Sequence, residues 1–145
     1  MTSRVFTIGY EQTTVSELMA ALQAAGVELV VDVRELPLSR RPGFSKTALS
    51  GALQEAGIAY EHLKALGTPK EGRDAAKKGD RVTLERVYAG RLELPEAQAA
   101  AAILLDRIDE RPTALLCYER EPKDCHRTLL LEAIAAEREV VDLLP

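Results

Sequence analysis

The sequence predicts an α/β fold: a three-layer α/β/α Rossmann-like domain with a mostly parallel sheet of about five strands. Short apolar runs alternate along the chain with longer segments of helical periodicity, the pattern of strands joined by crossover helices. The clearest run, residues 28–34, is almost continuously apolar, as parallel strands buried on both faces tend to be. A chain of 145 residues can bury one sizeable core, so we expect a single domain spanning residues 1–145.

Local signals order the elements in the first half of the chain. Thr13 or Thr14 can cap the first helix, because a hydroxyl there accepts a hydrogen bond from the first helical turn. Gly26 and Gly57 each follow a helical pattern and allow the left-handed conformation that ends many helices. The expected elements are strands 4–10, 28–34 and 58–63 and helices 14–25 and 46–56.

The second half begins with residues 64–81, which are rich in Gly, Lys and Asp and are expected to form an exposed loop with some helical turns. Pro95 suits the first turn of a long helix, and Pro112 marks its end. The expected elements are helices 83–92, 95–110 and 125–137 and strands 113–118 and 140–143.

Charge is distributed unevenly along the chain. The net charge is −4, yet segments 34–46 and 64–81 together carry ten Lys or Arg and only four Asp or Glu. Basic loops favour an anionic partner, either a small molecule or a nucleic acid, although solvated lysines are the simpler interpretation. No apolar run approaches the ~20 residues of a membrane span, and no signal-peptide pattern is present. We therefore expect a cytoplasmic protein without membrane contact, whose two cysteines are thiols rather than a disulfide framework.

Polar residues of unusual type follow each of the first four expected strands. Because the carboxyl ends of parallel strands meet at one edge, where ligands bind in such folds, we expect these residues to converge there. They are Gly9, Tyr10 and Glu11; Asp32, Arg34 and Ser39; Tyr60 and His62; and Cys117, Glu119, Cys125, His126 and Arg127.

Asp32 and Arg34 flank one residue at the end of a strand, so both side chains lie on the same face. They could form an internal salt bridge or share a ligand. A carboxylate this close to the core needs a partner, and Arg127 or a bound cation could also provide one. In the loop that follows, Ser39, Arg40 and Arg41 suit phosphate contacts, although the loop could also be merely structural.

Cys125 begins the last helix beside His126 and Arg127, a setting that lowers a thiol pKa and suits a nucleophilic or redox role. Cys117 is expected to be a small buried thiol that packs under the sheet edge. Zinc held by Cys117, Cys125, His126 and His62 is a rival, but its spacing is poor, because neighbouring residues of a helix point about 100° apart. A Cys117–Cys125 disulfide is a further alternative.

Glu119 and Asp32 form a pair of carboxylates suited to general acid–base catalysis or to holding a divalent cation such as Mg²⁺. Tyr10 and His62 could complete a set of proton-transfer groups, since histidine titrates near neutral pH. The alternative for His62 is a hydrogen-bonded histidine near the sheet.

Four ordered motifs resemble the prokaryotic domain-of-unknown-function family 488, and the resemblance covers most of the chain. The motifs are Thr7–Tyr10, Val31–Arg34 with Pro37 and Ser39, Tyr60–Leu63 with Leu66 and Gly67, and Leu116–Glu119 with Cys125–Arg127. The resemblance implies a compact cytoplasmic α/β domain in which these signatures converge, and it supplies no substrate. The signature residues here are Gly9, Tyr10, Asp32, Arg34, Ser39, Tyr60, His62, Cys117, Glu119, Cys125, His126 and Arg127.

The leading interpretation is an enzyme that acts on a phosphate-bearing ligand, either a nucleotide or a nucleic-acid end. Arg34, Arg40, Arg41 and Arg127 would bind the anion, and the other ligand-binding candidates are Gly9, Ser39, Tyr60 and His126. The catalytic candidates are Tyr10, Asp32, His62, Glu119 and Cys125. One alternative is a non-catalytic module that binds a nucleotide or nucleic acid through the same loops, and another is a zinc-binding or redox-sensing thiol protein.

Overall fold

A computed structural model describes residues 4–121 and 125–145 and confirms the α/β fold. Its sheet has five strands in the order β3-β2-β4-β1-β5, and every neighbouring pair is parallel. The strands are β1 (Arg4–Gly9), β2 (Leu29–Asp32), β3 (Ala59–His62), β4 (Thr113–Cys117) and β5 (Glu139–Leu143). Each lies inside or within one residue of its predicted segment.

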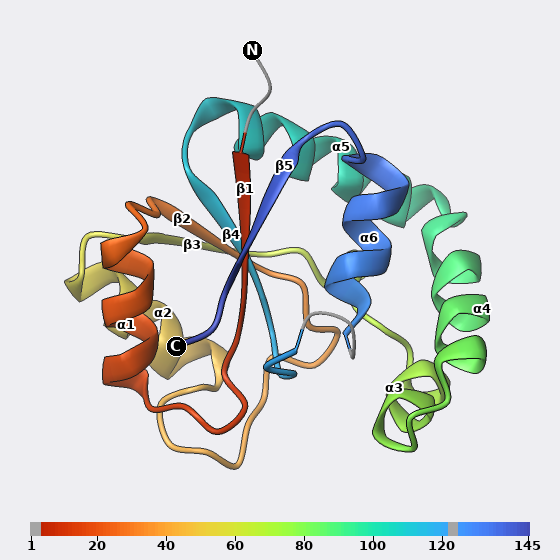
Figure 1. Ribbon diagram of the computed structural model, residues 1–145, viewed down its shortest axis with the longest axis horizontal. Coiled ribbons are helices and arrows are strands. Elements are labelled where there is room, and N and C mark those ends of the chain that lie inside the picture. The colour runs from red at the N-terminus through yellow and green to blue at the C-terminus, as the bar shows by residue number, and fades with distance from the viewer. Residues whose placement is uncertain (1–3, 122–124) are drawn as a thin grey trace.

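Helices cover both faces of this sheet and produce the predicted three layers (Figure 1). On one face, α1 (Val15–Ala24) and α2 (Lys46–Glu55) bury Leu18, Leu22, Leu49 and Leu53 against Val30 and Leu116. On the other face, α5 (Pro95–Glu110) and α6 (His126–Ile134) pack against Val31 and Leu115. Helix α4 (Arg81–Leu92) adds Tyr88 to this second core.

Segment 64–81 is more ordered than the predicted loop. It contains a 3₁₀ helix, η1 (Lys64–Leu66), and the helix α3 (Lys70–Lys77). Gly72 of α3 lets the chain approach Thr68 and Val87 closely, and a Cβ at Gly72 would lie 2.5 Å from the Thr68 Cγ2. Tertiary packing therefore orders a stretch whose composition alone indicates a loop.

The capping residues at the helix ends agree with the predicted start and end of α1 and with the predicted end of α2, but not with the predicted start of α6. Thr14 caps α1 by accepting a hydrogen bond from the Glu17 amide through its side chain, and the Thr14 amide in turn donates to the Glu17 carboxylate. Gly26 and Gly57 have positive φ, as predicted. Helix α6 is shorter than expected and begins at His126, so Cys125 is its N-cap rather than a residue of its first turn.

The candidate residues lie around the carboxyl end of β4, the central strand of the sheet. Helix α1 leaves β1 over one face of the sheet, whereas α6 leaves β4 over the other, so the connections that follow these two neighbouring parallel strands lie on opposite faces. Backbone hydrogen bonds connect the loop that follows β1 to the loop that follows β4. The Tyr10 amide donates to the Cys117 carbonyl, and the Glu11 amide donates to the Tyr118 carbonyl.

Across the described residues, none of the helices has the length and apolar character that a membrane span requires.

Candidate functional site

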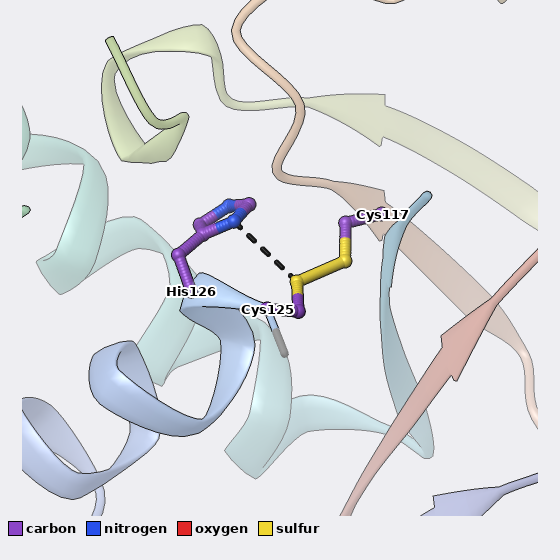
Figure 2. Close-up of side chains that lie close together, drawn as sticks. All are labelled: Cys117, Cys125 and His126. Atoms are coloured by element: carbon purple, nitrogen blue, oxygen red, sulfur yellow. Dashed lines mark hydrogen bonds between the residues drawn. A yellow bond between two sulfur atoms is a disulfide. The ribbon is translucent and has the colours of Figure 1, made fainter. Parts of the chain in front are cut away.

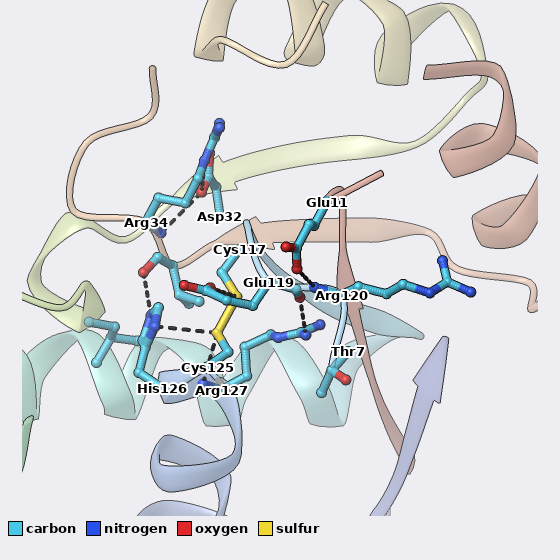
Figure 3. Close-up of a disulfide and its surroundings, with 12 residues drawn as sticks. Thr7, Glu11, Asp32, Arg34, Cys117, Glu119, Arg120, Cys125, His126 and Arg127 are labelled. Atoms are coloured by element: carbon cyan, nitrogen blue, oxygen red, sulfur yellow. Dashed lines mark hydrogen bonds and ion pairs between the residues drawn. A yellow bond between two sulfur atoms is a disulfide. The ribbon is translucent and has the colours of Figure 1, made fainter. Parts of the chain in front are cut away.

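The predicted site residues lie at the carboxyl edge of the sheet, but they form two groups on opposite faces rather than one. Asp32 follows Val30 by two residues and lies on the face covered by α1 and α2. Cys117 follows Leu115 by two residues and lies on the α5 and α6 face. Figure 3 shows Asp32 and Arg34 on one side of the Cys117–Cys125 disulfide and Arg127 on the other.

The first group, which we name the Asp32 cluster, consists of Asp32, Arg34, Tyr10 and Tyr60. Arg34 binds Asp32 through two side-chain bonds, Nε to Oδ1 at 2.8 Å and Nη2 to Oδ2 at 2.7 Å. The same guanidinium donates to the Tyr10 hydroxyl at 3.1 Å and to the Phe44 carbonyl at 2.7 Å. The internal salt bridge is therefore the correct alternative. Arg127 is not the partner of Asp32.

Hydrogen bonding saturates Asp32, which is 0% exposed. Its carboxylate accepts from the Arg34 amide and side chain and from the Tyr60 hydroxyl, the last at 2.5 Å. These four bonds use the lone pairs that Mg²⁺ would need, so the geometry does not favour a magnesium site at Asp32. Tyr60 is a donor here, and burial together with the Asp32 charge raises its pKa.

Arg34 remains a cation in this setting. Burial acts to lower its pKa, but the hydrogen bond and charge of Asp32, with a contribution from Tyr10, more than offset burial and raise it. The guanidinium thus binds the end of β2, the aromatic ring of Tyr10 and the loop at Phe44 together. Its described contacts are those of a structural pair.

The loop after β2 is also held by internal contacts. Ser39 Oγ accepts from the Arg41 amide at 3.0 Å, and the Arg41 guanidinium donates to the carbonyls of Tyr10 and Thr13. Arg40, in contrast, is exposed. His62 Nε2 lies 2.7 Å from the Arg34 carbonyl, which matches the hydrogen-bonded alternative for this histidine.

The second group, which we name the cysteine cluster, consists of Cys117, Cys125 and His126 (Figure 2). A disulfide joins Cys117 to Cys125, so the expectation of two separate thiols is corrected. Both residues are 1% exposed. Cys125 has an extended backbone, with φ −126° and ψ 156°, because it is the N-cap. The 100° separation of helical neighbours therefore does not apply, and the side chains of Cys125 and His126 converge.

The orientation of His126 follows from its buried contacts. Nε2 lies 2.8 Å from the Val33 carbonyl, and Nδ1 lies 3.5 Å from Cys125 Sγ. Burial, with a contribution from the charge of Arg127, lowers the pKa of His126 to about 4, so the ring is neutral at pH 7. Because a carbonyl can only accept, Nε2 carries the proton and the Nδ1 lone pair faces the sulfur. The Tyr88 ring packs against the imidazole in a T-shaped arrangement, with 5.1 Å between the ring centroids.

Arg127 is 0% exposed and lies directly after this histidine. Its amide donates to Cys125 Sγ at 3.4 Å, and its Nη2 donates to the Glu119 carbonyl at 2.7 Å. Burial lowers its pKa to about 10, while the charges of Glu119 and Asp142 act to raise it. Arg127 is still a cation at pH 7, and it binds the loop after β4 to α6.

Gly9 was predicted to be a site residue, and the structure gives it a packing role. A Cβ built at Gly9 would lie 1.8 Å from the Glu119 carbonyl oxygen, the same oxygen that accepts from Arg127. Only glycine permits this contact between the end of β1 and the loop after β4. Sequence analysis missed Tyr88, which packs against the His126 ring, because an aromatic residue in a helix carries no local sign of its contacts.

Substitution of Gly9 by alanine is expected to lower the free energy of unfolding by about 1–3 kcal/mol or more, because the obstructing atoms are backbone. Gly90 of α4 is the control, since a Cβ there meets nothing within 4 Å. Gly90→Ala should stabilise the protein by about 0.5–1 kcal/mol through helix propensity. Urea unfolding of both variants tests the contact, and effects of the same sign would contradict it.

One surface pocket of about 250 Å³ lies between α6 and β5, and its lining includes Thr7, Glu132 and Asp142. None of the predicted site residues is among the described residues that line it. The cysteine cluster therefore lies under packed side chains rather than in this pocket.

A family model matches most of this chain. Neither the curated proteins nor the solved structures contain a match to this chain. The family model described as "Domain of unknown function DUF488" matches residues 14–134, which include the Asp32–Arg34 pair, both cysteines, His126 and Arg127. The chain therefore belongs to the DUF488 family.

Proposed function

We propose that this protein is a thiol–disulfide switch in which Cys117 and Cys125 interconvert between a disulfide and two thiols. The observation that carries the proposal is the environment of Cys125 Sγ, which lies at the N-cap of α6 with the Arg127 amide and His126 Nδ1 within 3.5 Å. A helix N-terminus favours a thiolate at this position, and Arg127 adds a buried positive charge. Cys125 is therefore the sulfur better able to carry negative charge.

The chemistry is thiol–disulfide exchange with a small-molecule thiol. The thiolate of the reductant attacks Cys117 Sγ, the bond between the two cysteines breaks, and Cys125 leaves as the stabilised thiolate. A second reductant thiolate then attacks the mixed disulfide and releases Cys117 as a thiolate, which takes up a proton. The reductant leaves as its own disulfide, so two electrons pass to the protein.

Access to the sulfurs controls the rate of this exchange. Because each cysteine is 1% exposed, a reagent reaches the bond only when the surrounding chain opens. We expect native protein to exchange more slowly than unfolded protein under the same conditions.

The test is a redox titration of folded protein in glutathione buffers, with free thiols alkylated and counted by intact mass. We expect a single two-thiol transition with a midpoint between about −180 and −320 mV, the range of cellular glutathione pools, including the cytoplasm in which we place this protein. Cys117→Ser and Cys125→Ser should each show one thiol throughout, apart from mixed disulfides. A bond that stays intact below about −320 mV after full equilibration would identify a structural cystine and overturn the proposal.

A second candidate function is binding of a phosphate-bearing ligand, as a nucleotide enzyme or a non-catalytic module. Two exposed residues from the carboxyl edge favour it. Tyr118 is 45% exposed and is braced edge-on by Tyr10, at 5.4 Å between ring centroids, so it could stack on a base. Arg40 is exposed on the loop after β2 and could contact a phosphate.

Tyr118→Ala and Arg40→Glu should each weaken binding of a nucleotide or oligonucleotide if this second function is correct. A steep salt dependence would identify nucleic acid rather than a small ligand. Glu119→Gln distinguishes a nucleotide enzyme from a non-catalytic binding module. It should abolish the turnover of an enzyme, whereas it should leave the ligand affinity of a binding module unchanged. Affinity that neither surface variant alters would remove this candidate.

A further inference from the structure

We propose that the reduced cysteine cluster is a zinc site in which Cys117, Cys125 and His126 bind one Zn²⁺. The inference rests on the proposed function, because it requires the two thiols. Its main observation is that one donor atom from each of these three buried residues lies within 4.8 Å of the others (Figure 2). Thiolate and imidazole are the ligands that zinc prefers, and three protein ligands with a fourth position are a known zinc arrangement.

The backbone spacing suits two ligands of one ion. Zn–S bonds of about 2.3 Å in a tetrahedral site hold two sulfurs about 3.8 Å apart. The Cα atoms of Cys117 and Cys125 are 7.5 Å apart, beyond the usual disulfide range of about 4.4–6.8 Å. Their side chains can therefore approach an ion from two elements, the end of β4 and the N-cap of α6, without the backbones closing together.

His126 is already oriented as a ligand. Its Nε2 proton is directed at the Val33 carbonyl, which leaves the Nδ1 lone pair facing Cys125 Sγ. Bound histidines almost always donate their second nitrogen in this way, and the contact fixes both the tautomer and the ring plane. The Arg127 amide donates to Cys125 Sγ and provides a similar outer contact to the sulfur.

Glu119 is the candidate for the fourth position. Its Oε2 lies 3.5 Å from Cys117 Sγ, and its carbonyl is held by Arg127 (Figure 3). The charges then balance, because two thiolates and one carboxylate offset Zn²⁺ and the buried Arg127 cation. The sulfur and imidazole donors of the cysteine cluster favour zinc over Mg²⁺. The Asp32 carboxylate already accepts four hydrogen bonds, which disfavours a Mg²⁺ site at the Asp32 cluster.

Binding and release are coupled to thiol oxidation. Zn²⁺ displaces one proton from each thiol as it binds the two sulfurs and His126 Nδ1. A peroxide can reverse this: the two thiolates lose two electrons and form the disulfide, while hydrogen peroxide takes up those electrons and two protons to form two waters. The zinc ion, left without its thiolates, is released.

The experiment loads fully reduced protein with Zn²⁺ without oxygen, removes loosely bound metal by dialysis, and measures metal content by mass spectrometry. We expect about one zinc per chain in the wild type and in Glu121→Gln, the control for a charge change in the same loop. Cys117→Ser, Cys125→Ser and His126→Gln should each lose the ion, and Glu119→Gln should weaken binding by about tenfold or more. Full affinity in Glu119→Gln would overturn its role as the fourth ligand.

Cobalt substitution keeps the inference testable if a variant does not fold. Co²⁺ added to reduced wild-type protein should give the near-ultraviolet band of thiolate-to-cobalt charge transfer and the visible bands of tetrahedral cobalt, and peroxide should abolish both. Two titratable thiols without metal binding would overturn the zinc site and leave the proposed function standing. Failure to obtain the thiols in folded protein would overturn both.

Discussion

Asp32→Asn should lower the free energy of unfolding by about 3–5 kcal/mol, the cost of removing one partner from a buried ion pair. The substitution keeps the shape of the side chain but removes the charge that faces Arg34. Arg34 is itself buried, with its Nη2 2.7 Å from Asp32, so its cation would be left without a carboxylate. The amide would also give Tyr60 a poorer acceptor. Urea unfolding at pH 7 measures the loss.

Glu61→Gln provides the matched control, because it neutralises a carboxylate of the adjacent strand β3. Glu61 pairs with Arg107 at 2.8 Å, but both side chains are about one-third exposed. Water screens that pair, and we expect a loss below about 1 kcal/mol. The double variant Asp32→Asn/Arg34→Met should recover part of the first loss, since no unpaired cation remains. Equal losses in the two single variants would show that the Asp32 cluster is not a buried pair.

Alkaline pH should destabilise the protein through Tyr88. Burial raises the pKa of Tyr88 above the ordinary value of 10, and its hydroxyl donates to the Leu66 carbonyl at 2.7 Å. Below pH 10 the tyrosine is protonated in both states, so its contribution to stability is complete. Above pH 10 the unfolded chain loses the proton first, and the free energy of unfolding falls by about 1.4 kcal/mol for each further pH unit.

Tyr88→Phe isolates this effect. The variant loses a buried hydrogen bond, worth about 1 kcal/mol at neutral pH, but its stability should fall less steeply than that of the wild type between pH 10 and 12. Tyr118→Phe is the control, because that side chain is 45% exposed and should alter the slope much less. If the free energy of unfolding fell equally steeply with pH in the wild type and in Tyr88→Phe, Tyr88 would not be the group responsible for the alkaline loss of stability.

The sequence predicted at which edge of the sheet the candidate residues lie better than it predicted how these residues are arranged there. A strand such as Leu29–Asp32 is apolar throughout, so its end and the polar residues beyond it can be identified directly. The edge at which those residues gather follows from the parallel topology. The distribution over two faces depends on strand order and register, which place β4 between β2 and β1, and neither is encoded in a local pattern.

The errors at individual residues have local causes. Cys125 was expected inside a helix, and moving it by one position to the N-cap turns its sulfur toward Cys117. Three of the four arginines expected to hold an anion, Arg34, Arg41 and Arg127, donate to carboxylate or carbonyl oxygens of the protein itself. Composition shows that such loops are basic, but it does not show which arginine side chains form hydrogen bonds within the protein and which remain exposed to solvent. Contacts between segments that are distant in the sequence determine which arginines are buried.

The most direct test of the central claim is peptide mapping of air-oxidised, folded protein after alkylation of free thiols. Trypsin can cleave after Arg120, so Cys117 and Cys125 fall on different peptides that only a disulfide can hold together. We predict one joined pair of peptides that separates on reduction, with no alkylated cysteine before reduction. Two alkylated cysteines on separate peptides in the oxidised protein would show that the sulfurs do not meet.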